Sequence, residues 1–316
     1  MSYTTRIMKR HPKNPLISPG DIPNTFAVFN PSPVMFNGKT VLALSVYGHD
    51  KNSDGCNGKG VYIATSDDGV NFDINTKPFI DLTTPNHPFG FIEGGIIDCR
   101  ICKIDDTYYI VTPTHCKGEG PFALLGKTTD FVDYTPIDII SLPPNRGTSL
   151  FPEKIGGKYY KLDRPSGGTA GSIWIASSPD LIHWGHHRPL MQPGYSIWNI
   201  VKIGPTPPLK TKDGWLVILH GVMSWLQDSD QHYYIGAALL DLENPEKVIG
   251  KTSSYLLAPE EPYEMNGIVD NVVFPCGAIA DIERDELRLY YGAADKYIGL
   301  ATGALSEVIN ACKLGL

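Results

Sequence analysis

The sequence predicts an all-β protein, a five-bladed β-propeller, and three observations lead to this prediction. Aromatic residues make up 10% of the 316 residues, and the chain holds 32 Gly and 26 Pro, a mixture that favours short strands joined by turns. The hydrophobic content of 42%, with 19% charged residues, is typical of a packed globular protein. The third observation is a weak internal repeat that occurs five times.

Each repeat begins with a turn containing Gly or Asp, which precedes a strand rich in aromatic and branched residues. "NGKTVLALSVYG" and "KDGWLVILHGV" are two examples, and a second strand with small residues follows each one, as in "SIWIASSPDLIHW". The five copies of the first strand lie at 37–48, 105–114, 156–165, 212–222 and 284–295.

Five such sheets stacked around an axis bury the faces that a single small sheet leaves exposed. The same hairpins in two layers would form a β-sandwich, but five copies with one strand order favour the propeller. We expect residues 1–316 to form a single propeller domain with short terminal extensions at 1–25 and 303–316. The last extension, "GALSEVINACKLGL", is expected to form a short closing helix.

The charge and the chain ends indicate which partners to expect. A net charge of -7 argues against a general nucleic-acid binder. No apolar run approaches the roughly 18 residues of a membrane span, and "MSYTTRIMKRHPKNP" lacks the apolar stretch of a secretory signal. We therefore expect a cytoplasmic protein with six reduced cysteines and with no nucleic-acid or membrane partner. The terminal extensions offer surfaces for a possible homo-oligomer.

The stretch "CRIC", Cys99 to Cys102, together with "HC" at His115 and Cys116, raises the alternative of a zinc site. On a strand, an offset of three residues places the two sulfurs on opposite faces, which does not suit a tetrahedral metal. We therefore expect no metal.

Two sets of polar residues are expected to converge at the propeller axis. Stretches that follow the first strand of the repeats, including "LDRP", "LHGV" and "GAAD", place Arg164 and His220 at corresponding positions. A second stretch precedes each first strand and has a polar residue just ahead of an apolar run. These five polar residues are Asn30, Asp98, Arg146, Lys202 and Asp270.

In an acidic protein, the cluster of Arg146, Arg164, Lys202 and His220 requires an anion, and arginine forks suit a tetrahedral oxyanion such as phosphate. Asp98 is expected beside this cluster as an acid. Arg100 lies on the same face of the strand, where it can fix or tune Asp98. The prediction depends on the shared repeat register, since any one of these residues alone is more typical of the surface or the core.

The chain contains several longer motifs, among them "LFPEKIGGKYYKLDRP", "KIGPTPPLKTKDGWLVILHGV" and "YYGAADKYIGLAT". Together these motifs resemble glycoside hydrolase family 130 over nearly the whole chain. The resemblance implies a five-bladed propeller that acts on β-mannosides, in most members as an inverting phosphorylase and in some branches as a hydrolase. "GIIDCRI" matches the family's Gly-Ile-Glu-Asp-Pro-Arg stretch, so Asp98 matches the catalytic aspartate, with Ile97 and Cys99 in place of Glu and Pro.

The resemblance also implies roles for the remaining residues. Asn30 and Asp270 match sugar-binding positions, and we group Arg100 with them as substrate-binding. The family's first inner strand usually ends in an arginine and an acidic residue, whereas this chain has "ALSVYGHD" there. The matches to the family's phosphate-binding residues are Arg146, Arg164, Lys202 and His220.

These residues predict phosphorolysis of a β-mannoside, β-1,2 or β-1,4 linked, to α-mannose 1-phosphate and a shortened sugar. Asp98 would supply the proton, which family members are thought to pass through a hydroxyl of the mannose. Phosphate is a co-substrate, and no cofactor is expected. One alternative is an inverting β-mannosidase that uses water, with Glu153 or Asp163 as the base. The other is a sugar-binding propeller without catalytic activity.

Overall fold

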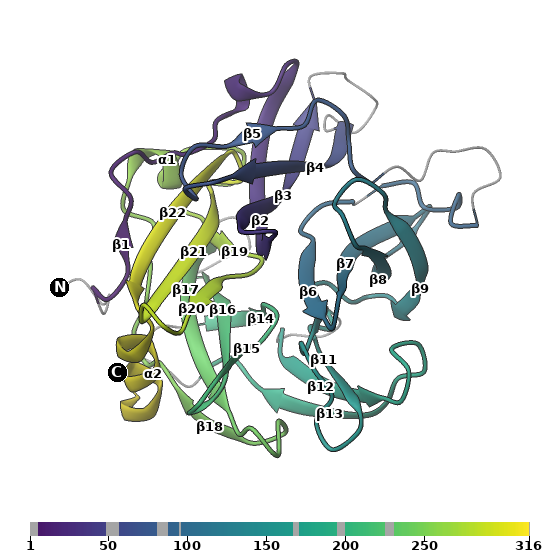
Figure 1. Ribbon diagram of the computed structural model, residues 1–316, viewed down its shortest axis with the longest axis vertical. Coiled ribbons are helices and arrows are strands. Elements are labelled where there is room, and N and C mark those ends of the chain that lie inside the picture. The colour runs from purple at the N-terminus through teal and green to yellow at the C-terminus, as the bar shows by residue number, and fades with distance from the viewer. Residues whose placement is uncertain are drawn as a thin grey trace.

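Five antiparallel sheets surround a common axis (Figure 1), and the predicted five-bladed β-propeller is confirmed. The computed structural model describes residues 6–48, 57–80, 88–94, 96–166, 171–194, 200–224 and 231–315. Within each of the first three blades the strands pair in sequence order. Blade 1 contains β2 (Thr25–Phe36), β3 (Lys39–Gly48), β4 (Asn57–Ser66) and β5 (Asp73–Ile74). Blade 2 contains β6 (Arg100–Ile104), β7 (Thr107–Cys116), β8 (Glu119–Thr128) and β9 (Thr135–Ser141).

Blade 3 follows the same plan, and blades 4 and 5 each have a short additional strand outside the main strand order. Blade 3 contains β10 (Ser149–Leu150), β11 (Tyr159–Asp163), β12 (Ile173–Ser178) and β13 (Gly185–Met191). Blade 4 contains β14 (Ile200–Pro205), β15 (Leu209–Thr211), β16 (Gly214–Ser224), β17 (Gln231–Leu240) and β18 (Val248–Lys251). Blade 5 contains β19 (Val273–Pro275), β20 (Ile279–Asp281), β21 (Glu286–Ala293) and β22 (Tyr297–Ala304). The short helices are η1 (Pro19–Asp21), α1 (Pro262–Met265) and α2 (Leu305–Leu314).

The strand that begins each predicted repeat is not the innermost one. It is the second strand outward from the axis in its blade. The stretch ahead of it, in which a polar residue precedes an apolar run, leads into or lies on the strand nearest the axis (Figure 1). The two predicted sets of polar residues therefore lie on neighbouring antiparallel strands, one at the beginning of the inner strand and the other toward the end of its partner. Antiparallel pairing places both sets at the same end of the propeller.

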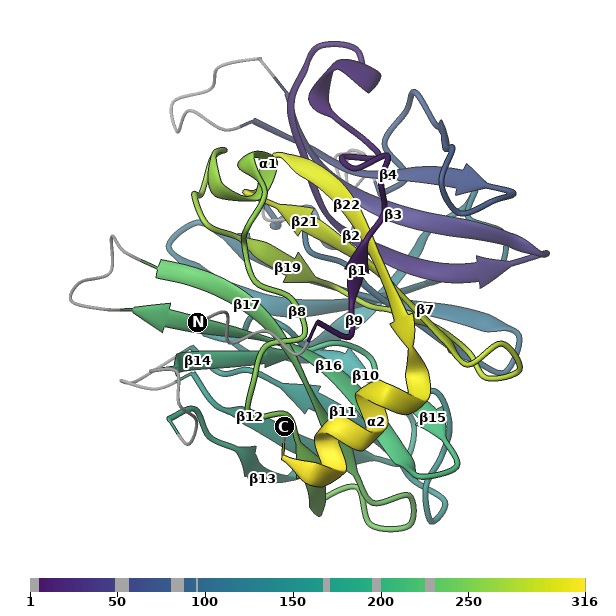
Figure 2. The same ribbon diagram turned by 90° about the vertical axis from the view of Figure 1, so that its left-hand side faces the viewer.

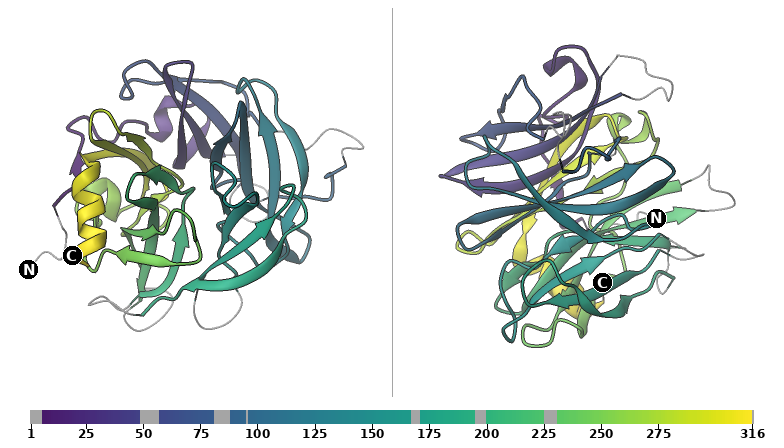
Figure 3. Two further views of the ribbon diagram at one scale, coloured as in Figure 1. Left: turned by 60° about the horizontal axis from the view of Figure 1, so that its bottom comes forward. Right: turned by 90° about the vertical axis from the view of Figure 1, so that its right-hand side faces the viewer.

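The N-terminal segment, expected outside the repeat, completes the last blade. Strand β1 (Lys9–Arg10) pairs antiparallel with β22, with Lys9 opposite Thr302, and it runs along the outer edge of blade 5 (Figure 2). The predicted closing helix is confirmed as α2, which begins at Leu305 because β22 continues through Ala304. Figure 3 shows α2 on the outside of the ring. Among the described residues, no helix has the length and apolar character to cross a membrane.

A buried ion pair fixes this closure. Arg10 donates from Nε to Glu264 Oε1 and from Nη2 to Glu264 Oε2, each at 2.8 Å. Glu264 is fully buried and also accepts a hydrogen bond from the Tyr291 hydroxyl at 2.7 Å. One carboxylate thus ties β1 to α1 and to β21, because its buried charge needs the Arg10 guanidinium.

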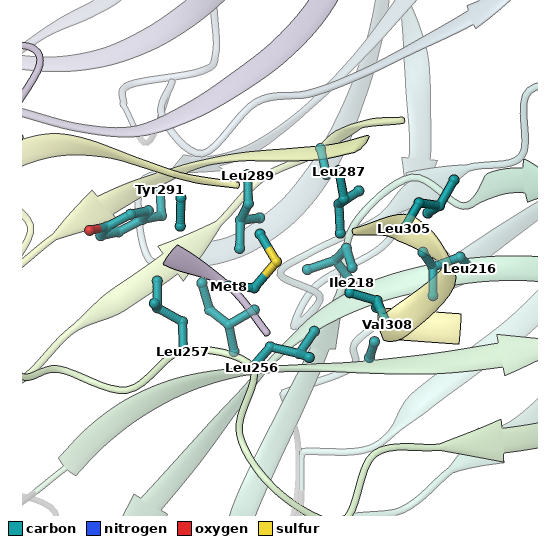
Figure 4. Close-up of a cluster of buried hydrophobic side chains, with 14 of the residues drawn as sticks. Met8, Leu216, Ile218, Leu256, Leu257, Leu287, Leu289, Tyr291, Leu305 and Val308 are labelled. Atoms are coloured by element: carbon teal, nitrogen blue, oxygen red, sulfur yellow. The ribbon is translucent and has the colours of Figure 1, made fainter. Parts of the chain in front are cut away.

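Separate apolar clusters fill the interfaces between adjacent blades. Strand side chains alternate between the two faces of each sheet, so one blade contributes to two clusters. The cluster between blades 4 and 5 contains Met8, Ile218 and Leu289, and α2 covers it with Leu305 and Val308 (Figure 4).

The alternation of faces at β6 separates the two cysteines of "CRIC". Cys99 packs in the cluster between blades 1 and 2, and Cys102 packs in the cluster between blades 2 and 3. Their sulfurs therefore face opposite sides of the sheet, as the offset of three residues on a strand predicts. The five cysteines in the described part of the chain are free thiols.

Replacing Arg10 by Met should lower the free energy of unfolding by about 3 kcal/mol, because Glu264 keeps a buried charge without its cation. Urea denaturation measures this loss. The matched control is Lys39→Met, which breaks the exposed pair between Lys39 and Asp67 at 3.0 Å and should cost about 0.5 kcal/mol or less. If both variants lose a similarly small amount of unfolding free energy, the ion pair between Arg10 and Glu264 does not stabilise the closure of the ring.

Candidate active site

Arg146 and Arg164 are 18 residues apart in sequence and adjacent in space. The Arg146 backbone N–H donates to the Arg164 carbonyl at 3.1 Å, and Arg164 Nε donates to the Arg146 carbonyl at 2.9 Å. This contact forms because β10 and β11 are antiparallel, so the residue before the first strand meets the residue after the second. The two arginines therefore occupy one corner of blade 3.

Asp98, just before β6, is buried and pairs with Arg146. Arg146 Nη2 donates to Asp98 Oδ2 at 2.9 Å, and Asn30 Nδ2 donates to Asp98 Oδ1 at 2.8 Å. The Asp98 backbone N–H donates to Ser45 Oγ at 2.9 Å. The negative charge of Asp98 raises the pKa of Arg146 further above its ordinary value, so the guanidinium stays charged. Asp98 thus belongs to the same cluster as the predicted phosphate-binding residues.

Arg100 lies beneath Asp98 and is itself buried. Its Nη1 donates to the Asp98 backbone carbonyl at 2.8 Å, and its Nε donates to the Pro205 carbonyl at 3.0 Å. The guanidinium thus links the inner strands β6 and β14 and holds the backbone of Asp98. Arg100 was expected to fix or tune Asp98, and its contact is with the Asp98 main chain. The direct contact of Arg100 with sugar stays a prediction.

Lys202 and His220 bring the neighbouring blade into the cluster. Lys202 Nζ donates to Gln231 Oε1 at 2.9 Å and lies 5.4 Å from the centre of the Tyr233 ring. Burial, reinforced by the positive charge of Arg164, holds the pKa of His220 well below its usual range. His220 is therefore a neutral imidazole, although the sequence placed it among the cations. Its buried Nδ1 has no hydrogen-bond partner among the described residues.

Gly171 lets Arg164 and Lys202 approach each other. A Cβ on Gly171 would lie 2.6 Å from Lys202 Cβ and 3.5 Å from Arg164 Nη1. The Gly171 carbonyl accepts a hydrogen bond from the Ile203 N–H at 2.9 Å, so the chain at Gly171 lies directly against β14. Burial and the charge of Arg146 lower the pKa of Arg164 to about 10. A bound anion would relieve this repulsion between cations.

The two predicted sugar-binding residues lie at different depths. Asn30, on β2, is buried beside Asp98. Asp270 is exposed in the loop before β19, where its Oδ1 accepts a hydrogen bond from the Gly267 N–H at 3.0 Å. The backbone carbonyl of the next residue, Asn271, accepts a hydrogen bond from the Tyr233 N–H at 3.0 Å, so the loop with Asp270 adjoins the strand of Tyr233. The sugar-binding roles of Asn30 and Asp270 stay predictions.

Two further residues of the cluster were not identified from the sequence. Asp295 lies on the turn between β21 and β22, and burial together with the charge of Asp98 raises the pKa of Asp295 to about 7. Tyr233, on β17, lies beside Lys202, and burial followed by the charge of Asp295 raises the pKa of its hydroxyl. "GAAD" marked the position of Asp295 by repeat register, whereas no pattern pointed to Tyr233.

Four residues of the site have left-handed backbone conformations. Their φ angles are 47° at Asn30, 51° at Asp98, and 49° at both Ala294 and Asp295. Such angles are uncommon outside glycine and are found most often for Asn and Asp. Strained backbone of this kind is typical of functional sites, where the surrounding structure holds a side chain in a required direction.

The two carboxylates considered as hydrolytic bases have other partners. Glu153 is exposed and pairs with Lys210 at 2.6 Å. Asp163 is buried, pairs with Lys161 at 2.9 Å and accepts hydrogen bonds from Ser141 and Thr148 at 2.9 and 2.7 Å. Both are therefore occupied by structural contacts.

The site combines a buried carboxylate and a neutral imidazole with four cations, which are Arg100, Arg146, Arg164 and Lys202. In the described part of the chain, no three His, Cys, Asp or Glu side chains gather as metal ligands. The arrangement suits a class of enzyme in which an acid assists transfer of a group to a bound oxyanion.

Comparison with known proteins identifies the family. The family model for β-1,4-mannooligosaccharide phosphorylase matches residues 2–314. The chain is 32% identical over 314 residues to the β-1,4-mannooligosaccharide phosphorylase of Ruminococcus albus, covering 97% of this chain and 91% of that protein. It is 40% identical over 256 residues to the β-1,2-mannobiose phosphorylase of Listeria innocua, and the match covers 79% of this chain and 68% of that protein. The solved complex of a Listeria innocua β-1,2-mannobiose phosphorylase with β-1,2-mannobiose superposes on this structure with a TM-score of 0.84 and 30% sequence identity. The match covers 97% of this chain and 99% of that chain. The chain therefore belongs to glycoside hydrolase family 130.

Replacing Gly171 by Ala should weaken the binding of inorganic phosphate at least about tenfold, because the added methyl group forces Lys202 and Arg164 apart. Isothermal titration calorimetry measures the affinity. Gly185→Ala is the matched control, since a Cβ there meets nothing within 4 Å. Equal phosphate affinities in the two variants would contradict the close approach at Gly171.

Proposed function

We propose that this protein catalyses the inverting phosphorolysis of β-mannosides with β-1,2 or β-1,4 linkage. The products are α-D-mannose 1-phosphate and a shortened acceptor sugar. The observation that carries the proposal is the ion pair between Asp98 and Arg146 at 2.9 Å, because it joins a buried acid to a group of cations. The phosphorylase activities of the Ruminococcus albus and Listeria innocua relatives support it.

Phosphate is held by the predicted anion-binding residues. Arg146 and Arg164 present planar forks to two phosphate oxygens, and Lys202 adds a point charge. His220, being neutral, contributes a ring N–H without adding charge. The cluster presents the phosphate to the face of the sugar opposite the leaving group, so a direct displacement inverts the configuration at the anomeric carbon.

Asp98 provides the proton for the leaving oxygen, directly or through a hydroxyl of the bound mannose. The phosphate dianion HPO₄²⁻ attacks the anomeric carbon, the bond to the leaving oxygen breaks, and that oxygen takes the proton of Asp98. The proton of the attacking phosphate then returns to Asp98, which leaves the sugar phosphate as a dianion. The acid is thereby restored for the next turnover, and no other reactant is needed.

The neighbouring residues have supporting roles in this proposal. Asn30 and Asp270 contact the sugar from the floor and the rim of the site, and Arg100 holds the backbone of Asp98 from below. Water as the nucleophile would need a second carboxylate as base, but Glu153 and Asp163 are occupied. The cytoplasmic location and a possible homo-oligomer stay predictions from the sequence.

Cleavage of β-mannobiose should require phosphate and Asp98. Asp98→Asn removes the proton donor and should lower kcat roughly 10³-fold, whereas Glu153→Gln should leave kcat within about twofold because Glu153 is exposed and pairs with the exposed Lys210. Released sugar, measured with and without phosphate, provides the test. Equal turnover in phosphate-free buffer, or loss of turnover in Glu153→Gln alone, would favour the hydrolase alternative.

Lys202→Met should weaken phosphate binding by about 2 kcal/mol, as expected for a lost charge-assisted hydrogen bond. The KM for phosphate should therefore rise roughly 30-fold, with little change in the KM for the mannoside. Lys210→Met is the matched control, because Lys210 lies on β15 and pairs with Glu153. A change of less than about threefold in the phosphate KM of Lys202→Met would be inconsistent with the anion site.

A further inference from the structure

Blade 3 carries a lysine and an aspartate that are both buried against blade 2. Lys161 and Asp163, on β11, are 0% and 3% exposed, and Lys161 Nζ lies 2.9 Å from Asp163 Oδ2. Residues two apart on a strand lie on the same face of a sheet. This face packs on the apolar cluster between blades 2 and 3, which also contains Leu150 and Leu181. Two charges therefore lie in an interface that is otherwise mainly apolar.

The polar atoms of this pair all have partners. Lys161 Nζ donates to the Ile140 carbonyl and to the Ser141 hydroxyl, both on β9. Asp163 Oδ1 accepts hydrogen bonds from Ser141 Oγ at 2.9 Å and from Thr148 Oγ1 at 2.7 Å. Thr148 is 2% exposed, so its hydroxyl is bound within the protein. The pair thus connects β9 and β11 to the segment just before β10.

Stability alone is a weak reason for such a pair. Removing two charges from water costs about as much as their attraction returns, and apolar side chains of similar volume often give equal or greater stability. A buried pair can instead select one arrangement of the chain, because each donor and acceptor requires a partner in a fixed direction. The segment that this pair selects begins at Arg146, two residues before Thr148, and Asp163 directly precedes Arg164.

The pairing of these two segments contains one extra residue. Ser149 pairs with Leu162, and Asn145 forms a bridge with Pro165. Between these two pairs, one segment has three residues and the other has two, as in a β-bulge. The longer segment contains Gly147, whose φ of 109° is a conformation that favours glycine. The bulge therefore sets the direction in which the flanking side chains leave the sheet.

Both arginines of the anion site flank this bulge. Arg146 Nη2 reaches Asp98 Oδ2 at 2.9 Å, and Arg164 Nε donates to the Arg146 carbonyl at 2.9 Å. The hydrogen bond from Thr148 to Asp163 crosses the bulge on the side that faces blade 2. A change in the bulge would move both guanidinium groups at once.

We propose that Asp163, paired with Lys161, is a positioning residue of the anion site: it holds Thr148 and thereby fixes the bulge that directs Arg146 and Arg164. The inference rests on the proposed function, because phosphate is the anion that the two arginines would bind. Asp163 faces blade 2, so it acts through the backbone of residues 146–148 and not by contact with phosphate.

Thr148→Val tests the link with the smallest change, because it removes only the hydroxyl that joins the bulge to Asp163. The KM for phosphate should rise at least about fivefold, since misdirected arginines lose part of their contact with the anion. The KM for the mannoside should stay within about twofold of wild type, because the sugar does not depend on the two guanidinium forks. Thr148→Ser keeps the hydroxyl and should keep both constants within about twofold. Sugar released from β-1,2- and β-1,4-mannobiose at varied phosphate concentrations measures these constants.

Two double variants test Asp163 itself. Lys161→Met with Asp163→Asn removes both charges but keeps a side-chain oxygen for Thr148, so the phosphate KM should stay within about twofold of wild type. Lys161→Met with Asp163→Val also removes that oxygen and should raise the phosphate KM at least about fivefold. A purely structural pair would change the melting temperature in these variants without separating their phosphate KM values.

Thr211→Val is the matched control, because Thr211 is a buried threonine on β15 whose hydroxyl donates to the Gly214 carbonyl at 2.7 Å. Its phosphate KM should equal that of wild type. A wild-type enzyme that requires phosphate, combined with a wild-type phosphate KM in Thr148→Val and in the Asp163→Val double variant, would overturn the positioning role and leave the proposed function intact. Equal losses in Thr148→Ser and Thr148→Val would overturn it as well. Turnover of the wild type that is independent of phosphate would overturn the proposed function, and the positioning role with it.

Discussion

The ion pair between Arg146 and Asp98 is the interaction on which the rest of the site depends. A single guanidinium contacts the only proposed proton donor at 2.9 Å and adjoins Arg164 through reciprocal backbone contacts. The acid and the anion site are therefore one electrostatic unit. Any charge that enters beside Arg146 alters the environment of Asp98, because Asp98 is buried and the two side chains are in contact. Under the proposed function, an anion that engages Arg146 would weaken its hold on Asp98 and so favour proton donation by Asp98.

The propeller makes this unit possible by bringing short segments from all five blades to one axis. Arg100 joins β6 to β14 through two carbonyls, and the chain at Gly171 lies directly against Lys202. The left-handed conformations of Asn30, Asp98 and Asp295 cost energy, and the surrounding sheets compensate for that cost. Closure of the ring by Arg10 and Glu264 holds α1 and β21 in place, and β21 leads directly to Asp295.

Repeat register in the sequence was sufficient to predict the five blades and to bring Asp98, Arg146, Arg164, Lys202 and His220 together. It could predict these features because antiparallel strands of equal design end at the same side of the propeller. It did not reveal that β1 completes blade 5, since two residues carry no detectable strand pattern. The neutral state of His220 and the backbone contacts of Arg100 also escaped prediction, because both arise from burial and from neighbours distant in sequence. The repeat register could have predicted that Asp295 belongs to the site, because "GAAD" aligns with "LDRP" and "LHGV". Tyr233 could be assigned to the site only from its three-dimensional contacts.

A crystal structure of the enzyme with inorganic phosphate tests the central claim most directly. We expect a phosphate oxygen within about 3 Å of Arg146, Arg164 and Lys202, with the contact between Arg146 and Asp98 lengthened or lost relative to 2.9 Å. Phosphate bound elsewhere on the propeller, with the Asp98–Arg146 pair unchanged, would contradict the view that one arginine serves both the acid and the anion.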